Sequence, residues 1–317
     1  MTKVKNYLSL IKFSHTIFAM PFAVIGFFLG LDLFLDLSEL VTYSPVLSGG
    51  SDKDFSVIFT WKFWIIKFIL VVLCMVFARS AAMAFNRYLD RHYDAKNPRT
   101  AVREIPAGVI SEKNALAFTI VNCSLFITTT FFINTICFYL SPVALFVILF
   151  YSYTKRFTAL CHLVLGLGLS LAPIGAYLAV TGVFDWLPVL FSFAVLFWVS
   201  GFDIIYALQD EEFDKANQLH SIPSILGKKN ALWVSVFLHL LSAVAVVFAG
   251  WYAAFGYWYW AGVAVFIGML IYQHSIVKPN DLRRVNLAFM TANGIASVVF
   301  ALLVLIDLFF TRTQYTI

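Results

Sequence analysis

Charged side chains are scarce in this sequence. Asp, Glu, Lys and Arg make up 12% of its 317 residues, whereas soluble domains usually carry about 25%. Hydrophobic residues account for 61% of the chain, and the mean hydropathy is +0.86. This composition excludes an ordinary soluble domain and predicts an all-α integral membrane protein.

The motifs of several common enzyme and cofactor classes are also absent. There is no GxGxxG sequence, Walker motif, Ser–His–Asp arrangement or His-rich metal cluster. The four cysteines include no CxxC pair and are interpreted as inert core residues. Because no charged tail or low-complexity linker marks a second module, residues 1–317 are expected to form a single domain. Five histidines are interpreted as structural: His92, His162, His220, His239 and His274.

Long apolar runs dominate the chain and predict nine transmembrane helices. The runs lie at residues 14–31, 61–86, 114–135, 138–153, 159–180, 187–207, 231–250, 255–274 and 286–310. Lysines precede the first run, as in a signal peptide, but no small-residue cleavage site follows it. The first run is therefore expected to be retained as a span.

The distribution of basic residues predicts the orientation of these spans. Lys and Arg gather at 87–113, 155–156, 215–229 and 278–284, on the same side as the N-terminus if there are nine spans. The other side carries mainly the acidic stretch 32–54. Because cytoplasmic loops are enriched in Lys and Arg, the N-terminus and both basic and acidic clusters on its side are expected to face the cytoplasm. The protein is expected to be a multi-pass protein of a bacterial inner membrane.

Two acidic clusters interrupt this apolar background. Asp90 with Asp94, and Asp210 with Asp214, are each spaced four residues apart, which places both carboxylates on one face of a helix. Carboxylates at membrane depth rarely persist without a partner. Two such pairs converging on one point describe a hard-cation site, for Mg²⁺ or alternatively Mn²⁺.

Each cluster belongs to a longer helical stripe of polar residues. In the first stripe an arginine lies deep in the span, with an amide and the carboxylates nearer its mouth, which suits a ligand with a charged head and an apolar body. A solvated helix end with local ion pairs is the simpler alternative. The first stripe consists of Arg79, Asn86, Asp90 and Asp94.

The second stripe is harder to explain structurally. It consists of Asp203, Tyr206, Asp210 and Asp214. Asp203 ends an apolar span and has no basic residue near it in sequence, so it must protonate or find a partner. Together the two stripes favour a functional site.

Cations on the same side of the membrane could bind phosphate. Arg99 follows the first cluster, and Tyr151 with Lys155 and Arg156 closes the turn after the fourth span. Arg binds phosphate bidentately, whereas Lys acts as a point charge. The positive-inside rule alone could also place these cations here. His15, at the first span, is either a substrate contact or an interfacial residue.

The two stripes resemble the motifs of the UbiA superfamily of intramembrane aromatic prenyltransferases. Those motifs are N-D-x-x-D-x-x-x-D on the second helix and D-x-x-Y-A-x-x-D-x-x-x-D on the sixth, here Asn86–Asp94 and Asp203–Asp214. Arg87 stands where many members have Asp, which resembles the homologues of the futalosine route to menaquinone. Further matches are Asn97-Pro98-Arg99-Thr100, Pro106-Ala107-Gly108, Tyr151, Lys155-Arg156 and Ser221.

The resemblance implies a nine-helix bundle around a central cavity that opens sideways to lipid. It also implies Mg²⁺-dependent transfer of a polyprenyl group from a polyprenyl diphosphate to an aromatic acceptor, 4-hydroxybenzoate-like or a menaquinone precursor, in quinone biosynthesis. Nucleic acid is not an expected partner. The metal ligands would be Asp90, Asp94, Asp210 and Asp214 with Asn86, the substrate contacts Arg79, Arg99, Tyr151, Lys155, Arg156, Tyr206 and His15, and a further catalytic carboxylate Asp203.

Two other functions fit a membrane protein with buried charges. A secondary transporter of an anionic metabolite would place charges near the midplane, often with paired helix breaks in its two halves. A Mg²⁺ channel would ring its carboxylates along a pore. Here the acidic clusters fall at helix ends on one side, and the Gly and Pro breaks are not paired between halves.

Overall fold

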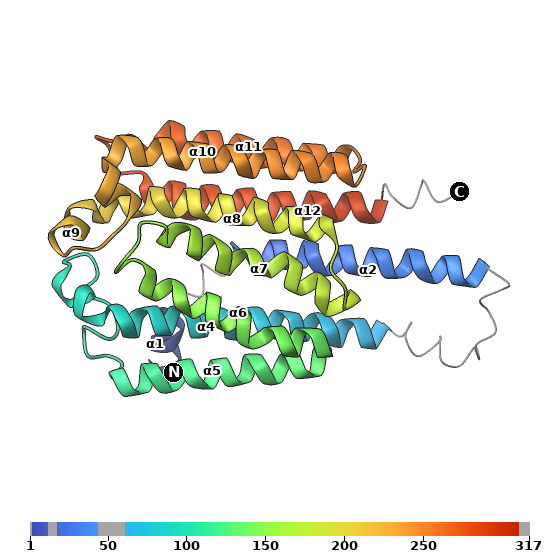
Figure 1. Ribbon diagram of the computed structural model, residues 1–317, viewed down its shortest axis with the longest axis horizontal. Helices are drawn as coiled ribbons and strands as arrows, with labels where there is room; N and C mark the ends of the chain where they lie inside the picture. The colour runs from blue at the N-terminus through green and yellow to red at the C-terminus, as the bar shows by residue number, and fades with distance from the viewer. Residues whose placement is uncertain (1, 12–17, 44–60, 311–317) are drawn as a thin grey trace.

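The computed structural model describes residues 2–11, 18–43 and 61–310, in which all the regular elements are helical. The helices run side by side along the long axis of the molecule (Figure 1). Their bounds are α1 Thr2–Leu10, α2 Met20–Tyr43, α4 Trp61–Lys96, α5 Glu112–Ile133, α6 Thr135–Thr154, α7 Cys161–Thr181, α8 Trp186–Ala207, α9 Glu211–Ala216, α10 Ile222–Tyr252, α11 Tyr257–Ile276 and α12 Asn293–Phe310.

The predicted all-α membrane class is confirmed. Within the described part of the chain, eight helical segments are long and apolar enough to cross a membrane, and the apolar stretch Met20–Phe34 of α2 is shorter. The eight segments coincide with eight of the nine predicted spans. The remaining prediction, the first span at 14–31, overlaps α2, but its residues 14–17 are not among the described residues.

The helix ends differ from the prediction at the two acidic clusters. Helix α4 continues to Lys96, so that Asp90 and Asp94 lie on its last two turns. The second stripe was expected on one continuous helix, and this is wrong. Helix α8 ends at Ala207, a 3₁₀ turn spans Leu208–Asp210, and the short α9 follows. Asp210 therefore ends the 3₁₀ turn while Asp214 lies on α9, and both line the same cavity.

A second break lies in α10. Gly227 has φ +74° and ψ 164°, which is not helical and which residues with a side chain rarely adopt. The sequence pattern placed this span at 231–250, whereas the helix begins at Ile222, with Ser221 as its N-cap. The extra turn before Gly227 brings the start of α10 against the end of α8 that carries Asp203.

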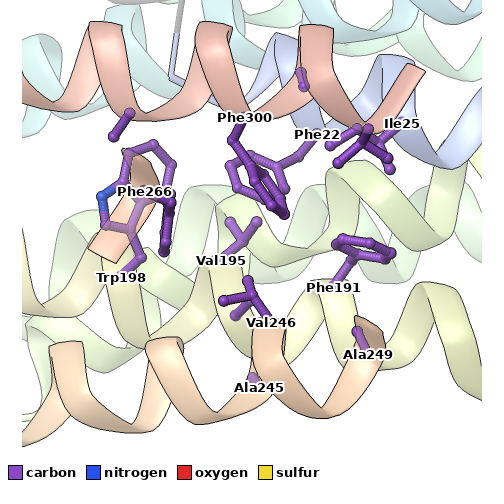
Figure 2. Packing of buried hydrophobic residues seen from close by; sticks show 14 of the residues in the cluster. Phe22, Ile25, Phe191, Val195, Trp198, Ala245, Val246, Ala249, Phe266 and Phe300 are labelled. Atoms are coloured by element: carbon purple, nitrogen blue, oxygen red, sulfur yellow. The ribbon is translucent and has the colours of Figure 1, made fainter. Parts of the chain in front are cut away.

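A buried aromatic core holds α2, α8, α10, α11 and α12 together. Phe22 from α2, Trp198 from α8, Phe266 from α11 and Phe300 from α12 are fully buried and form ring contacts with centroids 5.4–6.4 Å apart (Figure 2). The Trp198 Nε1–H donates to Asn293 Oδ1 at 2.9 Å. Within a bilayer the hydrophobic effect does not drive helices together, because lipid tails are as apolar as the side chains. Aromatic packing and interhelical hydrogen bonds of this kind therefore supply the attraction between helices.

Close backbone approach joins α7 to α8. A Cβ atom added at Gly166 would lie 2.3 Å from Ser200 Oγ and 2.4 Å from the Leu196 carbonyl oxygen. Only a residue without a side chain permits this approach. The approach matters for the site because α7 carries His162 and α8 carries Asp203.

We expect Gly166→Ala to lower the free energy of unfolding by about 1–3 kcal/mol, because the added methyl overlaps α8. Gly168→Ala, two residues along α7, is the matched control, since its Cβ would lie 3.8 Å from Ile148 Cα, an ordinary contact. Thermal unfolding in detergent micelles measures both. Equal midpoints for the two variants would contradict the tight α7–α8 contact.

Candidate active site

A polar cavity of about 290 Å³ lies at one end of the bundle, bordered by α4, the loop after it, the turn after α6, and the α8–α9 segment. In Figure 1 this is the end where α9 lies. Every predicted site residue within the described part of the chain lines this cavity. The remaining predicted residue, His15, is not among the described residues. These lining residues are Arg79, Asn86, Asp90, Asp94, Arg99, Tyr151, Lys155, Arg156, Asp203, Tyr206, Asp210 and Asp214.

The carboxylates of the first cluster are each paired with a cation. Arg156 Nη2 lies 2.8 Å from Asp90 Oδ1. Arg103 Nη1 lies 2.7 and 2.9 Å from the two oxygens of Asp94. Asn86 Nδ2 donates to the other oxygen of Asp90 at 3.0 Å. Charge-assisted contacts of this length are stronger than neutral hydrogen bonds.

The second cluster is paired in the same way. Lys155 Nζ lies 2.8 Å from Asp214 Oδ1, and the Asp214 side chain is fully buried. Arg99 contacts both oxygens of Asp210, with Nε 3.0 Å from Oδ1. The Asn97 amide donates to Asp210 at 3.1 Å, and Ser221 Oγ donates to Asp214 at 2.8 Å.

Three of these four pairs connect segments that are far apart in sequence, whereas Arg103 and Asp94 are nine residues apart. The loop after α4 supplies Arg99 to the α8–α9 cluster, and the turn after α6 supplies Lys155 to that cluster and Arg156 to α4. Each motif is therefore held by at least one cation from a distant part of the chain.

Two of these cations lie outside the membrane-spanning segments, and their pKa values are raised. Burial lowers the pKa of the Arg99 guanidinium, but Asp210 beside it outweighs burial, so that its pKa lies above the ordinary value. Burial likewise lowers the pKa of the Lys155 ammonium, and Asp214 outweighs it. Both side chains therefore stay charged at neutral pH and remain available to an anion.

Arg87, the residue that departs from the usual family pattern, forms a separate buried pair. Its Nη1 lies 3.3 Å from Glu104 Oε2, in the loop after α4. The position therefore ties that loop to α4.

One residue of the cavity, His162, was assigned the wrong role from the sequence. It was interpreted as structural, yet its Nδ1 lies 2.6 Å from Asp203 Oδ2. This histidine is the partner that Asp203 lacked in sequence. The two residues are 41 positions apart, on α7 and α8, so that no local spacing could have paired them.

A second, apolar cavity of about 390 Å³ adjoins the polar one. Arg79, Met83, Tyr151, Leu165 and Leu169 line both cavities and mark their junction. Within the described part of the chain, the buried Nε of Arg79 has no hydrogen-bond partner. An unsatisfied buried guanidinium favours an anionic ligand at the junction.

The cavity has the donor chemistry for a hard divalent cation. Asp90, Asp94, Asp210 and Asp214 supply only oxygen ligands, which Mg²⁺ prefers. Among residues 2–11, 18–43 and 61–310, however, no three His, Cys, Asp or Glu side chains form a ready-made metal cluster. The carboxylates face the cavity while they are bound to cations, so metal binding requires these pairs to rearrange.

A membrane bundle with an ion-paired polar cavity beside an apolar one suits an intramembrane enzyme whose substrate has an anionic head and an apolar chain. The chain belongs to the UbiA prenyltransferase family, whose model matches residues 45–310. The resemblance found in the sequence is confirmed. The protein is accordingly a prenyltransferase and a multi-pass integral membrane protein.

Curated relatives agree with this assignment. A 4-hydroxybenzoate octaprenyltransferase from Nitrosomonas europaea is 30% identical over 249 residues, covering 78% of this chain and 84% of the relative. A protein of the same name from Aliivibrio fischeri is 31% identical over 237 residues, covering 73% and 80%.

Solved structures share the fold. A UbiA homologue from Aeropyrum pernix K1 superposes with a TM-score of 0.71 at 27% identity, covering 92% of this chain and 95% of that one. A homologue from Archaeoglobus fulgidus, solved with DMAPP and Mg²⁺, gives a TM-score of 0.67 at 20% identity and covers 96% and 99%. At that identity the second comparison establishes the fold alone.

Proposed function

We propose that this enzyme transfers a polyprenyl group from a polyprenyl diphosphate to an aromatic acceptor of quinone biosynthesis, either 4-hydroxybenzoate or a menaquinone precursor. The observation that carries the proposal is that the two cavities adjoin, so that a cavity with charged groups for a diphosphate lies beside apolar space for its chain. Two curated relatives are named 4-hydroxybenzoate octaprenyltransferases, and a homologue from Archaeoglobus fulgidus binds DMAPP and Mg²⁺.

Asp90, Asp94, Asp210 and Asp214, with Asn86 assisting, would hold Mg²⁺ or Mn²⁺ on the diphosphate. The bound metal would neutralise charge that develops on the leaving diphosphate. The chain must first release these carboxylates from their cations. The same cations, Arg99, Arg103, Lys155 and Arg156, are the diphosphate ligands in this proposal.

Substrate binding is then an exchange of partners. Phosphate oxygens take over the guanidinium and ammonium groups, because Arg and Lys bind phosphate as readily as carboxylate. The freed carboxylates become metal ligands. Tyr206, whose hydroxyl accepts a hydrogen bond from Arg99 Nη1 at 3.0 Å, would move with Arg99 and orient a phosphate oxygen.

The remaining residues serve the chain and the acceptor. The apolar cavity receives the prenyl chain, and its exclusion of water protects the allylic cation left when the bond to diphosphate breaks. Arg79 would bind the carboxylate of the acceptor, and Tyr151 would pack beside it. Asp203 would accept a hydrogen bond from the acceptor hydroxyl. This hydrogen bond would raise the electron density of the aromatic ring, which attacks the cation.

Position in the membrane follows from the charges. The cavity end also carries Lys228 and Arg283, so we place the active site at the cytoplasmic face of a bacterial inner membrane. Residues 1–317 would form one catalytic domain, and His15 remains a predicted substrate contact.

An assay of purified protein in detergent, with geranyl diphosphate, Mg²⁺ and a panel of aromatic acceptors, tests the proposed function. We expect a prenylated product by mass spectrometry that EDTA abolishes. Asp210→Asn should lower turnover about 10²-fold or more, because it weakens charge stabilisation of the leaving group. Asp281→Asn removes an exposed carboxylate that pairs with Arg283 and is the matched control. Unchanged product in EDTA, or wild-type turnover in Asp210→Asn, contradicts the proposal.

Arg79→Gln should raise the KM for an acceptor carboxylate about 10- to 100-fold, because a hydrogen bond to a charged group contributes about 1.5–3 kcal/mol. The KM for geranyl diphosphate should stay within about twofold, since other cations hold the diphosphate. Steady-state kinetics with 4-hydroxybenzoate and with the same phenol lacking its carboxylate measure the effect. An equal loss for both acceptors would show that Arg79 does not bind the carboxylate.

A further inference from the structure

His162 links three helices at the wall of the polar cavity. It lies on α7, its side chain is 3% exposed, and its Nδ1 lies 2.6 Å from Oδ2 of Asp203 on α8. Its other ring nitrogen faces the first residue of α10, Ile222. The Asp203 side chain is 25% exposed and lines the cavity, so the pair reaches from the helix packing into the substrate space.

The contacts of His162 assign its proton. The backbone N–H of Ile222 donates to Nε2 at 3.3 Å, so Nε2 carries a lone pair and no hydrogen. This N–H is at the start of a helix, where it has no partner within α10. The ring proton therefore resides on Nδ1 and is donated to Asp203. Helix α10 thus determines which tautomer Asp203 meets.

This arrangement occupies one oxygen of Asp203. Oδ2 accepts from His162, and within the described residues no protein group is paired with Oδ1. A carboxylate that accepts a strong hydrogen bond is held in one rotamer. Oδ1 is left as the basic atom available to the cavity.

We propose that His162 is a positioning residue that holds Asp203 as the proton acceptor for a phenolic hydroxyl. The inference rests on the proposed function and specifies its acceptor, an aromatic ring whose hydroxyl lies beside the alkylated carbon. As that carbon bonds to the allylic carbon, the hydroxyl proton moves to Asp203 Oδ1 and the ring becomes a neutral dienone. The ring C–H proton then leaves to water, and Asp203 returns its proton to the oxygen. One proton is released per product, together with diphosphate.

Three substitutions of His162 test this role. In His162→Asn the side-chain amide lies close to the position of Nδ1 and can donate to Asp203, so we expect kcat within about tenfold of wild type. His162→Gln, with its amide nearer the position of Nε2, and His162→Leu should lose about 10²-fold in kcat, in the range of general acid–base effects. The KM for geranyl diphosphate should not change, because the diphosphate ligands are untouched.

A double-mutant cycle separates positioning from a structural role. Asp203→Asn alone should lose about as much as His162→Leu, and the double variant should lose no more than Asp203→Asn. Losses that add, or a His162→Asn protein as slow as His162→Leu, would overturn the proposal. Thermal unfolding of each variant identifies a folding defect, and the His162→Asn comparison still decides if His162→Leu does not fold.

Binding of geranyl diphosphate with Mg²⁺, measured by calorimetry, distinguishes failure of this inference from failure of the proposed function on which it rests. We expect wild type and every His162 variant to bind alike. Loss of binding only in the variants would make His162 part of the diphosphate site and overturn its positioning role. A wild type that binds no diphosphate and forms no product would instead overturn the proposed function.

Discussion

The pairing of four buried or half-buried aspartates with four cations is the constraint on which the cavity end of this protein depends. An isolated carboxylate at this depth would be strongly unfavourable, and removing one partner of a buried pair leaves an uncompensated charge. The pairs also organise the chain. The loop after α4 and the turn after α6 reach across the cavity to carboxylates on α4 and on the α8–α9 segment. A backbone hydrogen bond also joins the turn after α6 to the segment that follows α9, since the Lys155 carbonyl accepts from the His220 N–H at 2.7 Å.

Under the proposed function, the same pairs make the binding of metal and the binding of diphosphate depend on each other. A metal alone must displace a cation from each carboxylate, and a diphosphate alone must displace a carboxylate from each cation. When both arrive, each displaced group gains a new partner of opposite charge. Under the proposed function, the folded protein stores its substrate ligands as internal ion pairs, and each of these four pairs has no net charge.

Much of this could be predicted from the sequence, because bilayers impose strong and local rules. Apolar runs located eight spans, and polar stripes with offsets of three, four and seven identified the cavity residues. Local patterns could not show which cation meets which carboxylate, since Arg99 and Asp210 are 111 residues apart.

Backbone breaks and long-range partners were missed for the same reason. The polar residues keep their helical spacing through Leu208–Asp210, so the sequence predicted an unbroken helix there. The folded chain instead forms a 3₁₀ turn over these residues. Nothing in the sequence separated His162 from the other histidines of this chain. Its role depends on Asp203 and on the N–H of Ile222, which only the folded arrangement of α7, α8 and α10 brings together.

Competition between cations and metal for the same carboxylates is tested most directly by Mn²⁺ binding without diphosphate. Electron paramagnetic resonance titration would compare wild type with Arg156→Gln, which frees Asp90, and with Arg283→Gln, which removes an exposed charge paired with Asp281. If the pairs compete with metal, Arg156→Gln binds Mn²⁺ more tightly than wild type while Arg283→Gln does not change. Equal or weaker binding by Arg156→Gln would contradict the exchange of partners.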